Sequence, residues 1–219
     1  MRIVLLHAFP LDERMWEPQR EGLRGHELLT PRLYGRGSTM DDWAASLLEE
    51  LPGELVLVGA SMGGYCALAI KRREPERVAG LVLAGSRADA DSPERREGRA
   101  DTIELIRREG AAGLWESMRP KLLAEDADDA LVARARALAL GRQVEDLVAA
   151  VEAIRDRADN SDLLQGRTLA ILGDADPFVS TEEVPADEVY VLPGASHLVS
   201  MERATEFNEL LEGWLKQWQ

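Results

Sequence analysis

Ser61 lies in the sequence Gly-Ala-Ser-Met-Gly at positions 59–63, directly after an apolar run. A Gly-x-Ser-x-Gly pattern between a strand and a helix is typical of a serine whose hydroxyl is displayed on a sharp turn. Side chains two positions before and after the serine would collide in such a turn, which explains Gly59 and Gly63. A serine hydroxyl becomes a nucleophile when a base removes its proton, so this chemistry requires a histidine and a group that orients it. The alternative is a small residue at an ordinary strand–helix junction.

Two loops late in the chain contain candidates for the base and the acid. His197 follows an apolar run in "PGASHL", and two aspartates, Asp174 and Asp176, follow another in "LGDADPF". Loops at the carboxyl ends of parallel strands meet at one edge of a sheet, so these side chains can approach Ser61. We predict Ser61 as the nucleophile and His197 as the base, in the chain order serine, aspartate, histidine. We predict Asp176 as the acid because Pro177 fixes the turn beyond it, whereas Asp174 orders the loop.

Acyl transfer also needs two donors aimed at the oxyanion that forms on the carbonyl. Met62 directly follows the candidate nucleophile, and we predict its backbone N–H as one donor. The other is predicted to be the N–H of Phe9 in the loop "HAFP", since Pro10 has no N–H. His7 is in the same loop, and we predict a structural role for it, with its ring hydrogen-bonded to loop backbone.

Short apolar runs separated by helical patterns must position these residues. The runs are apolar throughout rather than alternating, which is typical of parallel strands covered on both faces. Their alternation with helices predicts an α/β fold. The expected strands span residues 2–6, 26–33, 54–59, 78–85, 167–173 and 187–194, and the helices between them span 12–24, 40–51, 62–73 and 201–218.

One long segment breaks this alternation. Residues 87–164 contain only helical patterns, and the segment is too long for an ordinary connection. We predict an all-helical cap, inserted between the fourth and fifth strands, on a core domain of residues 1–86 and 165–219. A separate helical bundle domain is the alternative. The run "DSPERREGR" at 91–99 is expected to be a solvated hinge or first helical turn.

Composition limits the possible partners. The net charge of −14 disfavours nucleic acid and anionic membrane surfaces. A single cysteine, Cys66, excludes an intrachain disulfide, and three histidines make a zinc site difficult to assemble. The N-terminal apolar run is too short for a signal sequence or a membrane span. We therefore expect a cytoplasmic protein, and the chemistry above implies no metal or organic cofactor.

These segments together resemble the α/β-hydrolase superfamily, in particular its small capped bacterial esterases and lactonase-like members. The resemblance covers nearly the whole chain, through "LLHAFPLDERMWEPQ", "TPRLYGRGST", "LVGASMGGYCAL", "AIRDRADNSDLL", "ILGDADPF" and "LPGASHLVSMERATEFNELLEGWL". Ala8 stands where the family usually has glycine, and Arg32 where it has aspartate. The two antiparallel strands that usually open the fold are missing, so we expect about six strands in a mainly parallel sheet.

The resemblance implies a serine hydrolase that cleaves a small-to-medium carboxylic ester, thioester or lactone through an acyl-enzyme. Alternative activities are a cofactor-free haloperoxidase or perhydrolase-like reaction, carbon–carbon bond hydrolysis and acyl transfer. A ligand-binding or signalling protein on the same fold is an alternative of another class, and turnover of generic esters discriminates it. The sequence leaves the oligomeric state open.

Residues that line the substrate site are expected in the loop after the first strand and in the cap. Their apolar character favours a hydrophobic acyl or alcohol part. Arg119 and Lys121 could meet an anionic substrate, with a solvated position as the alternative. The expected lining residues are Leu11, Leu114, Trp115, Met118 and Leu122.

Overall fold

The structure is a computed structural model that describes residues 1–217. Within these residues six strands form one sheet in the order β2-β1-β3-β4-β5-β6, and every neighbouring pair is parallel. This confirms the predicted six-stranded parallel sheet. The strands are β1 (Arg2–Leu6), β2 (Glu27–Leu29), β3 (Leu55–Ala60), β4 (Val78–Ala84), β5 (Thr168–Gly173) and β6 (Glu188–Leu192).

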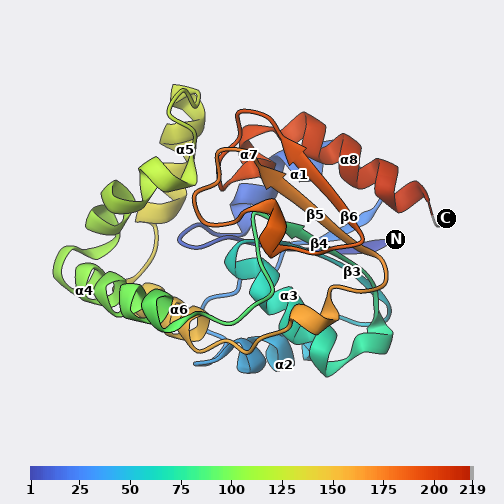
Figure 1. Cartoon of the computed structure of the whole chain (residues 1–219), viewed down its shortest axis with the longest axis horizontal. Helices are drawn as coiled ribbons and strands as arrows, with labels where there is room; N and C mark the ends of the chain where they lie inside the picture. Colours follow the sequence, from blue (N-terminus) through green and yellow to red (C-terminus); the bar gives the residue numbers. More distant parts are fainter. Residues whose placement is uncertain (218–219) are drawn as a thin grey trace.

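Helices cover both faces of this sheet (Figure 1). Alternate residues of β1 enter two separate apolar clusters, Val4 and Leu6 on one face and Ile3 and Leu5 on the other. Because both faces are buried, the strand runs are apolar at every position. The helices on one face are α2 (Met40–Glu50) and α3 (Met62–Arg73), and those on the other are α1 (Glu17–Gly22) and α8 (Ala204–Lys216).

The predicted strand at residues 26–33 is too long, because β2 ends at Leu29. Pro31 has no N–H to donate to a neighbouring strand, and the N–H of Leu33 donates to the ring of His7 instead. Beyond these residues the chain bends through Gly35 and Gly37, which have φ values of 81° and 119°. The segment after β2 is therefore a loop that packs on the loop after β1.

Two predicted helices are divided in the structure. Residues 12–24 form the 3₁₀ helix η1 (Glu13–Trp16) followed by α1, because Pro18 fits the first turn of a helix and not its interior. Residues 201–218 fall in α7 (Val199–Glu202) and α8, which are separated by the non-helical backbone of Arg203. Residue 218 lies outside the described residues.

Residues 87–164 are helical, as predicted, and lie beside the sheet at the left of Figure 1. They follow β4 and precede β5. Helix α4 is interrupted at Gly110, where φ is 66° and ψ is −161°. The elements are α4 (Pro93–Leu122), α5 (Asp129–Leu140), α6 (Val144–Arg155) and η3 (Ser161–Leu163), and the remaining short 3₁₀ helices of the described chain are η2 (Pro75–Arg77) and η4 (Thr181–Glu183).

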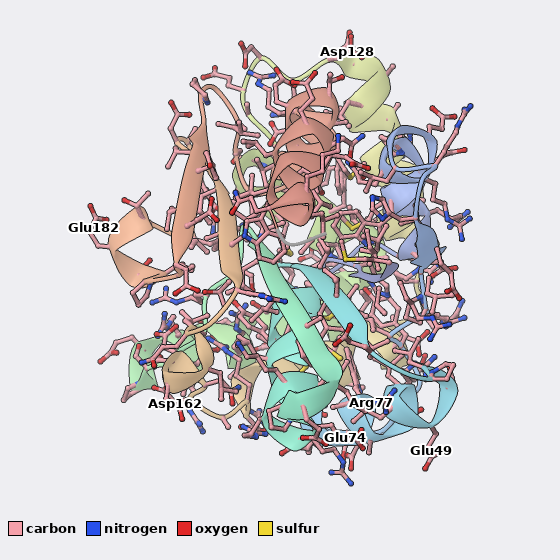
Figure 2. The ribbon with its side chains drawn as sticks, turned by 90° about the vertical axis from the view of Figure 1, so that its right-hand side faces the viewer. Glu49, Glu74, Arg77, Asp128, Asp162 and Glu182 are labelled. Atoms are coloured by element: carbon pink, nitrogen blue, oxygen red, sulfur yellow. The ribbon has the colours of Figure 1, made fainter. Side chains whose placement is uncertain are left out.

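Acidic side chains project from the outside of the molecule. In Figure 2 the labelled Glu49, Asp128, Asp162 and Glu182 all lie at the periphery and point away from the ribbon. These exposed carboxylates contribute to the net charge of −14. No helix within residues 1–217 has both the length and the apolar character that are needed to cross a bilayer.

Candidate active site

Ser61 occupies a strained turn between β3 and α3. Its backbone has φ 48° and ψ −112°, a region that residues other than glycine rarely adopt. A Cβ atom on Gly59 would lie 2.4 Å from the carbonyl oxygen of Gly63, and one on Gly63 would lie 2.1 Å from that of Leu6. Both glycines are therefore required by the close approach of β1, β3 and α3. The local sequence folds into a sharp turn that displays Ser61.

The strand order explains why distant loops meet at this turn. β1 and β3 are neighbours in the sheet, yet the chain leaves β1 toward β2 at one edge and leaves β3 toward β4 on the other side. A crevice forms at the carboxyl ends of strands where the order reverses in this way. Phe9 follows β1 and Ser61 follows β3, while Asp176 and His197 follow β5 and β6. The topology therefore brings all four residues to one edge.

His197 connects Ser61 to Asp176. Its Nε2 atom lies 2.7 Å from Oγ of Ser61, and its Nδ1 atom lies 2.9 Å from Oδ2 of Asp176. The other carboxylate oxygen of Asp176 accepts a hydrogen bond of 2.8 Å from the N–H of Phe178. The ring of Phe178 contacts the imidazole edge-on, with 4.7 Å between centroids. A fully buried carboxylate is thus linked through a buried imidazole to a partly exposed hydroxyl.

The other candidate acid and base have different partners. Oδ1 of Asp174 accepts a hydrogen bond of 2.7 Å from the N–H of Gly194, so Asp174 orders the loop, as predicted. Nε2 of His7 accepts the N–H of Leu33 at 3.1 Å, and its Nδ1 lies 3.2 Å from the carbonyl oxygen of Ala8. Burial lowers the pKa of His7 to about 4. The ring is therefore neutral at pH 7 and bonded to loop backbone, also as predicted.

The two predicted oxyanion donors follow β1 and β3, the strands that end beside Ser61. Met62 is the first residue of α3, and N–H groups in the first turn of a helix have no partner within the helix. Phe9 borders the same cavity as Ser61, and its N–H makes no hydrogen bond within residues 1–217. The N–H of Ala8 contacts Sδ of Met15 at 3.2 Å instead. Two N–H groups without internal acceptors are thus placed near Ser61.

The loop after β6 is bonded to the end of α4. Glu202 accepts the N–H of Ser196 at 2.8 Å and the N–H of Ala124 at 2.7 Å. In addition, the N–H of Leu198 donates to the carbonyl of Leu122 at 3.0 Å. Burial raises the pKa of Glu202 above its usual range. This link was missed at the sequence level, because no local pattern connects two segments about eighty residues apart.

A cavity of about 510 Å³, including its open mouth, borders Ser61 and His197. Met118 lines it as predicted, whereas Arg119 and Lys121 do not. The other predicted lining residues do not border this cavity, because helical spacing identifies a buried face but not the part of it that reaches a cavity. Those side chains are at most 2% exposed and belong to the apolar clusters: Leu11, Leu114, Trp115 and Leu122.

Charged residues also line the cavity, three of them from the segment 91–99 that was expected to be solvated. Arg87, Asp91, Arg95 and Arg99 all border it. The Asp91 side chain is fully buried, because its carboxylate pairs with Arg99 at 3.0 Å and with Arg157 at 2.7 Å. The available sequence signal was the spacing of Asp91, Arg95 and Arg99, since residues four apart share one face of a helix. Among the apolar lining residues, Tyr65, Ile154 and Phe178 were also missed.

Two further observations concern metal ligands and the free thiol. Within residues 1–217, no three His, Cys, Asp or Glu side chains are grouped so that they could hold a metal ion. Burial raises the pKa of the Cys66 thiol to about 12, so this residue carries no thiolate at neutral pH. The arrangement around Ser61 has the parts that acyl transfer to a serine requires.

Comparisons with known proteins agree with this geometry. A model described as "Alpha/beta hydrolase family" matches residues 3–210. A pimeloyl-[acyl-carrier protein] methyl ester esterase from Aromatoleum aromaticum is 41% identical over 91 residues, which are 38% of this chain and 36% of that protein. The matched region thus spans about a third of the curated relative's length.

Solved structures are similar over almost the whole chain. A thermophilic esterase from Thermogutta terrifontis, solved with malate bound, is 34% identical with a TM-score of 0.90, covering 99% of this chain and 90% of that one. An enol-lactonase from Burkholderia xenovorans LB400 is 24% identical with a TM-score of 0.85, covering 98% and 91%, and this likeness shows the fold. The chain belongs to the alpha/beta hydrolase family.

Proposed function

We propose that this protein is a serine hydrolase that cleaves a small-to-medium carboxylic ester, thioester or lactone. The observation that carries the proposal is the chain of contacts from Asp176 through His197 to Ser61, at 2.9 and 2.7 Å. Both distances are those of hydrogen bonds, and their order matches a nucleophile, a base and an orienting acid.

Acylation begins when Oγ of Ser61 attacks the substrate carbonyl and its proton passes to Nε2 of His197. Asp176 accepts the Nδ1–H of His197, which fixes the tautomer that leaves Nε2 free to act as the base. The same carboxylate stabilises the imidazolium as it forms. His197 then protonates the leaving alkoxide or thiolate, and an acyl-Ser61 ester remains.

Two backbone N–H groups, of Phe9 and Met62, bind the oxyanion in this scheme. A donor of this kind contributes about 3 kcal/mol to lowering the barrier, because it is already oriented toward the charge that develops. Water then enters, His197 removes its proton, and the second tetrahedral intermediate collapses to release the acid and Ser61. Every step uses side chains and N–H groups of this chain.

The names of the relatives support the ester-hydrolase assignment. The Aromatoleum aromaticum relative is a methyl ester esterase, and the Thermogutta terrifontis structure is of an esterase. We further propose that residues 87–164 act as a cap. They lie outside the layers that cover the sheet, and residues of this segment line the cavity beside Ser61.

A fluorophosphonate probe tests the nucleophile directly. We expect it to label the wild-type protein and to fail on Ser61→Ala, whereas the control Ser38→Ala, at an exposed serine, labels normally. A rate panel of 4-nitrophenyl esters of increasing acyl length, with simple lactones alongside, should show turnover that Ser61→Ala abolishes. Equal labelling or equal turnover of wild type and Ser61→Ala would overturn the proposal.

A further inference from the structure

The cavity beside Ser61 presents guanidinium groups to whatever occupies it. Arg95 and Arg99, one helical turn apart at the start of α4, border the cavity together with Ser61 and His197. The geometry points to a substrate that carries a carboxylate in addition to its scissile ester, with Arg99 as the residue that binds this carboxylate and Arg95 beside it. This inference rests on the proposed function, because it assigns the substrate class of the same site.

The guanidinium groups outnumber the carboxylates that they contact. Asp91 pairs with Arg157 at 2.7 Å, with Arg99 at 3.0 Å and with Arg95 at 3.6 Å, which is more cations than one carboxylate needs. Arg95 also pairs with Asp89, as does Arg87, which contacts Glu183 as well. These ion pairs join four arginines to three carboxylates. Within these ion pairs the guanidinium groups outnumber the carboxylates by one, while the exposed Glu94 and Asp159 interact electrostatically with Arg95 and Asp89.

Arg99 is the arginine whose hydrogen-bonding capacity is least used. Its Nε donates to Asp91, and within residues 1–217 its two terminal nitrogens have no hydrogen-bond partner. In contrast, Arg87 uses all three nitrogens, on Asp89, Glu183 and the carbonyl of Phe178. A guanidinium with both terminal nitrogens available can bind a carboxylate through two parallel hydrogen bonds.

The charge of Asp91 does not by itself explain why an arginine is present at position 99. Arg157, whose side chain is 2% exposed, already pairs with that carboxylate and stacks on Tyr65 at 4.1 Å. The Arg99 side chain is 27% exposed and borders the cavity. Arg99 shares its one carboxylate partner, Asp91, with Arg95 and Arg157, and a bound anion would supply the counter-charge that this sharing leaves incomplete. The site gathers arginines in a protein whose net charge is −14.

Apolar side chains complete the cavity and limit the rest of the substrate. Met118, Ile154 and Phe178 border it together with the arginines. These side chains fit a short hydrocarbon part that separates the scissile carbonyl from the distal carboxylate. The substrate class is therefore a short ester or lactone with an apolar spacer and one free carboxylate, on either its acyl or its alcohol part.

Two matched pairs of esters test this assignment and the side of the carboxylate. The acyl pair is 4-nitrophenyl hydrogen glutarate and 4-nitrophenyl pentanoate, which share a leaving group and acyl length. The alcohol pair is 4-acetoxybenzoate and phenyl acetate. In at least one pair we expect wild type to prefer the anionic ester about tenfold or more in kcat/KM, as for a hydrogen bond to a charged group. Arg99→Gln should abolish most of that preference, and Arg99→Lys should retain part of it.

Arg108→Gln is the matched control, because Arg108 is an exposed arginine of the same helix that pairs with its neighbour Glu109. It should keep the wild-type preference. A measurement on wild type alone guards against a variant that fails to fold: glutarate should inhibit hydrolysis of the pentanoate ester competitively, and glutaramide should inhibit at least tenfold more weakly.

The outcomes separate this inference from the proposed function. Turnover of the neutral esters without preference for an anionic one, or a preference unchanged in Arg99→Gln, overturns the carboxylate site and leaves the hydrolase intact. No turnover of any of the four esters by wild type overturns the proposed function, and the substrate assignment with it.

Discussion

Two buried carboxylates near the same cavity have opposite surroundings. Asp176 contacts one ionisable partner, the imidazole of His197, whereas Asp91 is surrounded by three arginines. Guanidinium groups keep their protons under all ordinary conditions, so the charge of Asp91 is permanently balanced. An imidazole is neutral until it accepts a proton, so Asp176 is available to stabilise a positive charge that exists only during reaction. Similar burial thus accompanies the catalytic role that we propose for one region and the structural and binding role that we propose for the other.

The largest expected effect comes from a change in the first region, at Asp176. Asp176→Asn should lower kcat for ester hydrolysis by about 10⁴-fold, because an asparagine in this position favours the wrong tautomer of His197. The amide is nearly the same size as the carboxylate, so the free energy of unfolding should change little by comparison. Steady-state kinetics and urea unfolding on the same preparation measure the two effects.

Asp174→Asn is the matched control, two residues away in the same loop. Its side chain bonds to the N–H of Gly194, and an asparagine oxygen can still accept that bond. We expect kcat within about threefold of wild type, since no reacting group is touched. A greater loss of activity in Asp174→Asn than in Asp176→Asn would reverse our assignment of the acid.

A change in the second region should affect stability. Arg157→Met removes a guanidinium that is 2% exposed and leaves fewer cations on the fully buried Asp91. Arg157 also donates to the carbonyls of Asp89 and Ile154, so although Arg95 and Arg99 remain near Asp91, the free energy of unfolding should fall by about 3 kcal/mol. The control is Arg155→Met, on a pair whose side chains are 31% and 45% exposed, where we expect less than about 1 kcal/mol. Equal effects in urea unfolding would show that burial does not distinguish the two pairs.

The two histidines of this sheet edge sharpen the contrast between a reactive and a structural role. Burial lowers the pKa of His7 from 6.5 to about 4. Between these pH values the unfolded chain binds a proton that the folded protein excludes, so stability falls as the pH falls. This dependence amounts to about 3 kcal/mol between pH 6.5 and 4.

The His7→Asn variant lacks the titrating group and should show a shallower decrease over this range. Its unfolding free energy is also expected to be lower than that of wild type at pH 7, because the bond from Leu33 is disturbed. The informative quantity is therefore the slope against pH, from urea unfolding at half-unit intervals. Parallel curves for wild type and variant would contradict the assignment of a neutral, buried His7.

The regions around Asp176 and Asp91 also differ in how far the sequence predicts them. Gly59, Ser61 and Gly63 satisfy a steric requirement within five residues, so the turn is visible in the sequence alone. Strands buried on both faces give uniform apolar runs, and loops at their carboxyl ends carry Asp176 and His197 to one edge.

The charged wall of the cavity had a weaker local signature, because the four-residue spacing of Asp91, Arg95 and Arg99 does not show what these side chains face. Asp91 and Arg157 are 66 residues apart, and their pairing depends on how α4 and the end of α6 pack together. For the same reason the helical spacing of Leu114, Trp115 and Leu122 indicated burial without indicating which core they enter. Both the pairing of Asp91 with Arg157 and the position of these apolar side chains depend on how the helical segment packs. Short sequence patterns do not encode that packing.

The smallest expected effect concerns the residue that joins the two regions. Glu202 accepts one N–H from the loop of His197 and one from the end of α4, through its two carboxylate oxygens. The two N–H groups donate to different carboxylate oxygens, so Glu202→Gln places an NH2 donor in front of one of them. The position of His197 should become less restricted, and we expect kcat to fall about tenfold, the equivalent of one hydrogen bond to a charged group.

Hydrogen exchange locates this effect. Amides in residues 121–125 and 195–199 should exchange faster in Glu202→Gln, while those of β3 and β4 keep wild-type protection. The control is Glu206→Gln on the exposed side of α8, which should change neither exchange nor kcat. If kcat falls but exchange stays unchanged in both segments, Glu202 acts on the reaction by its charge rather than by tethering the loop to the helix. If neither changes, the contact between the two regions is dispensable, and the helical segment and the catalytic loops work independently.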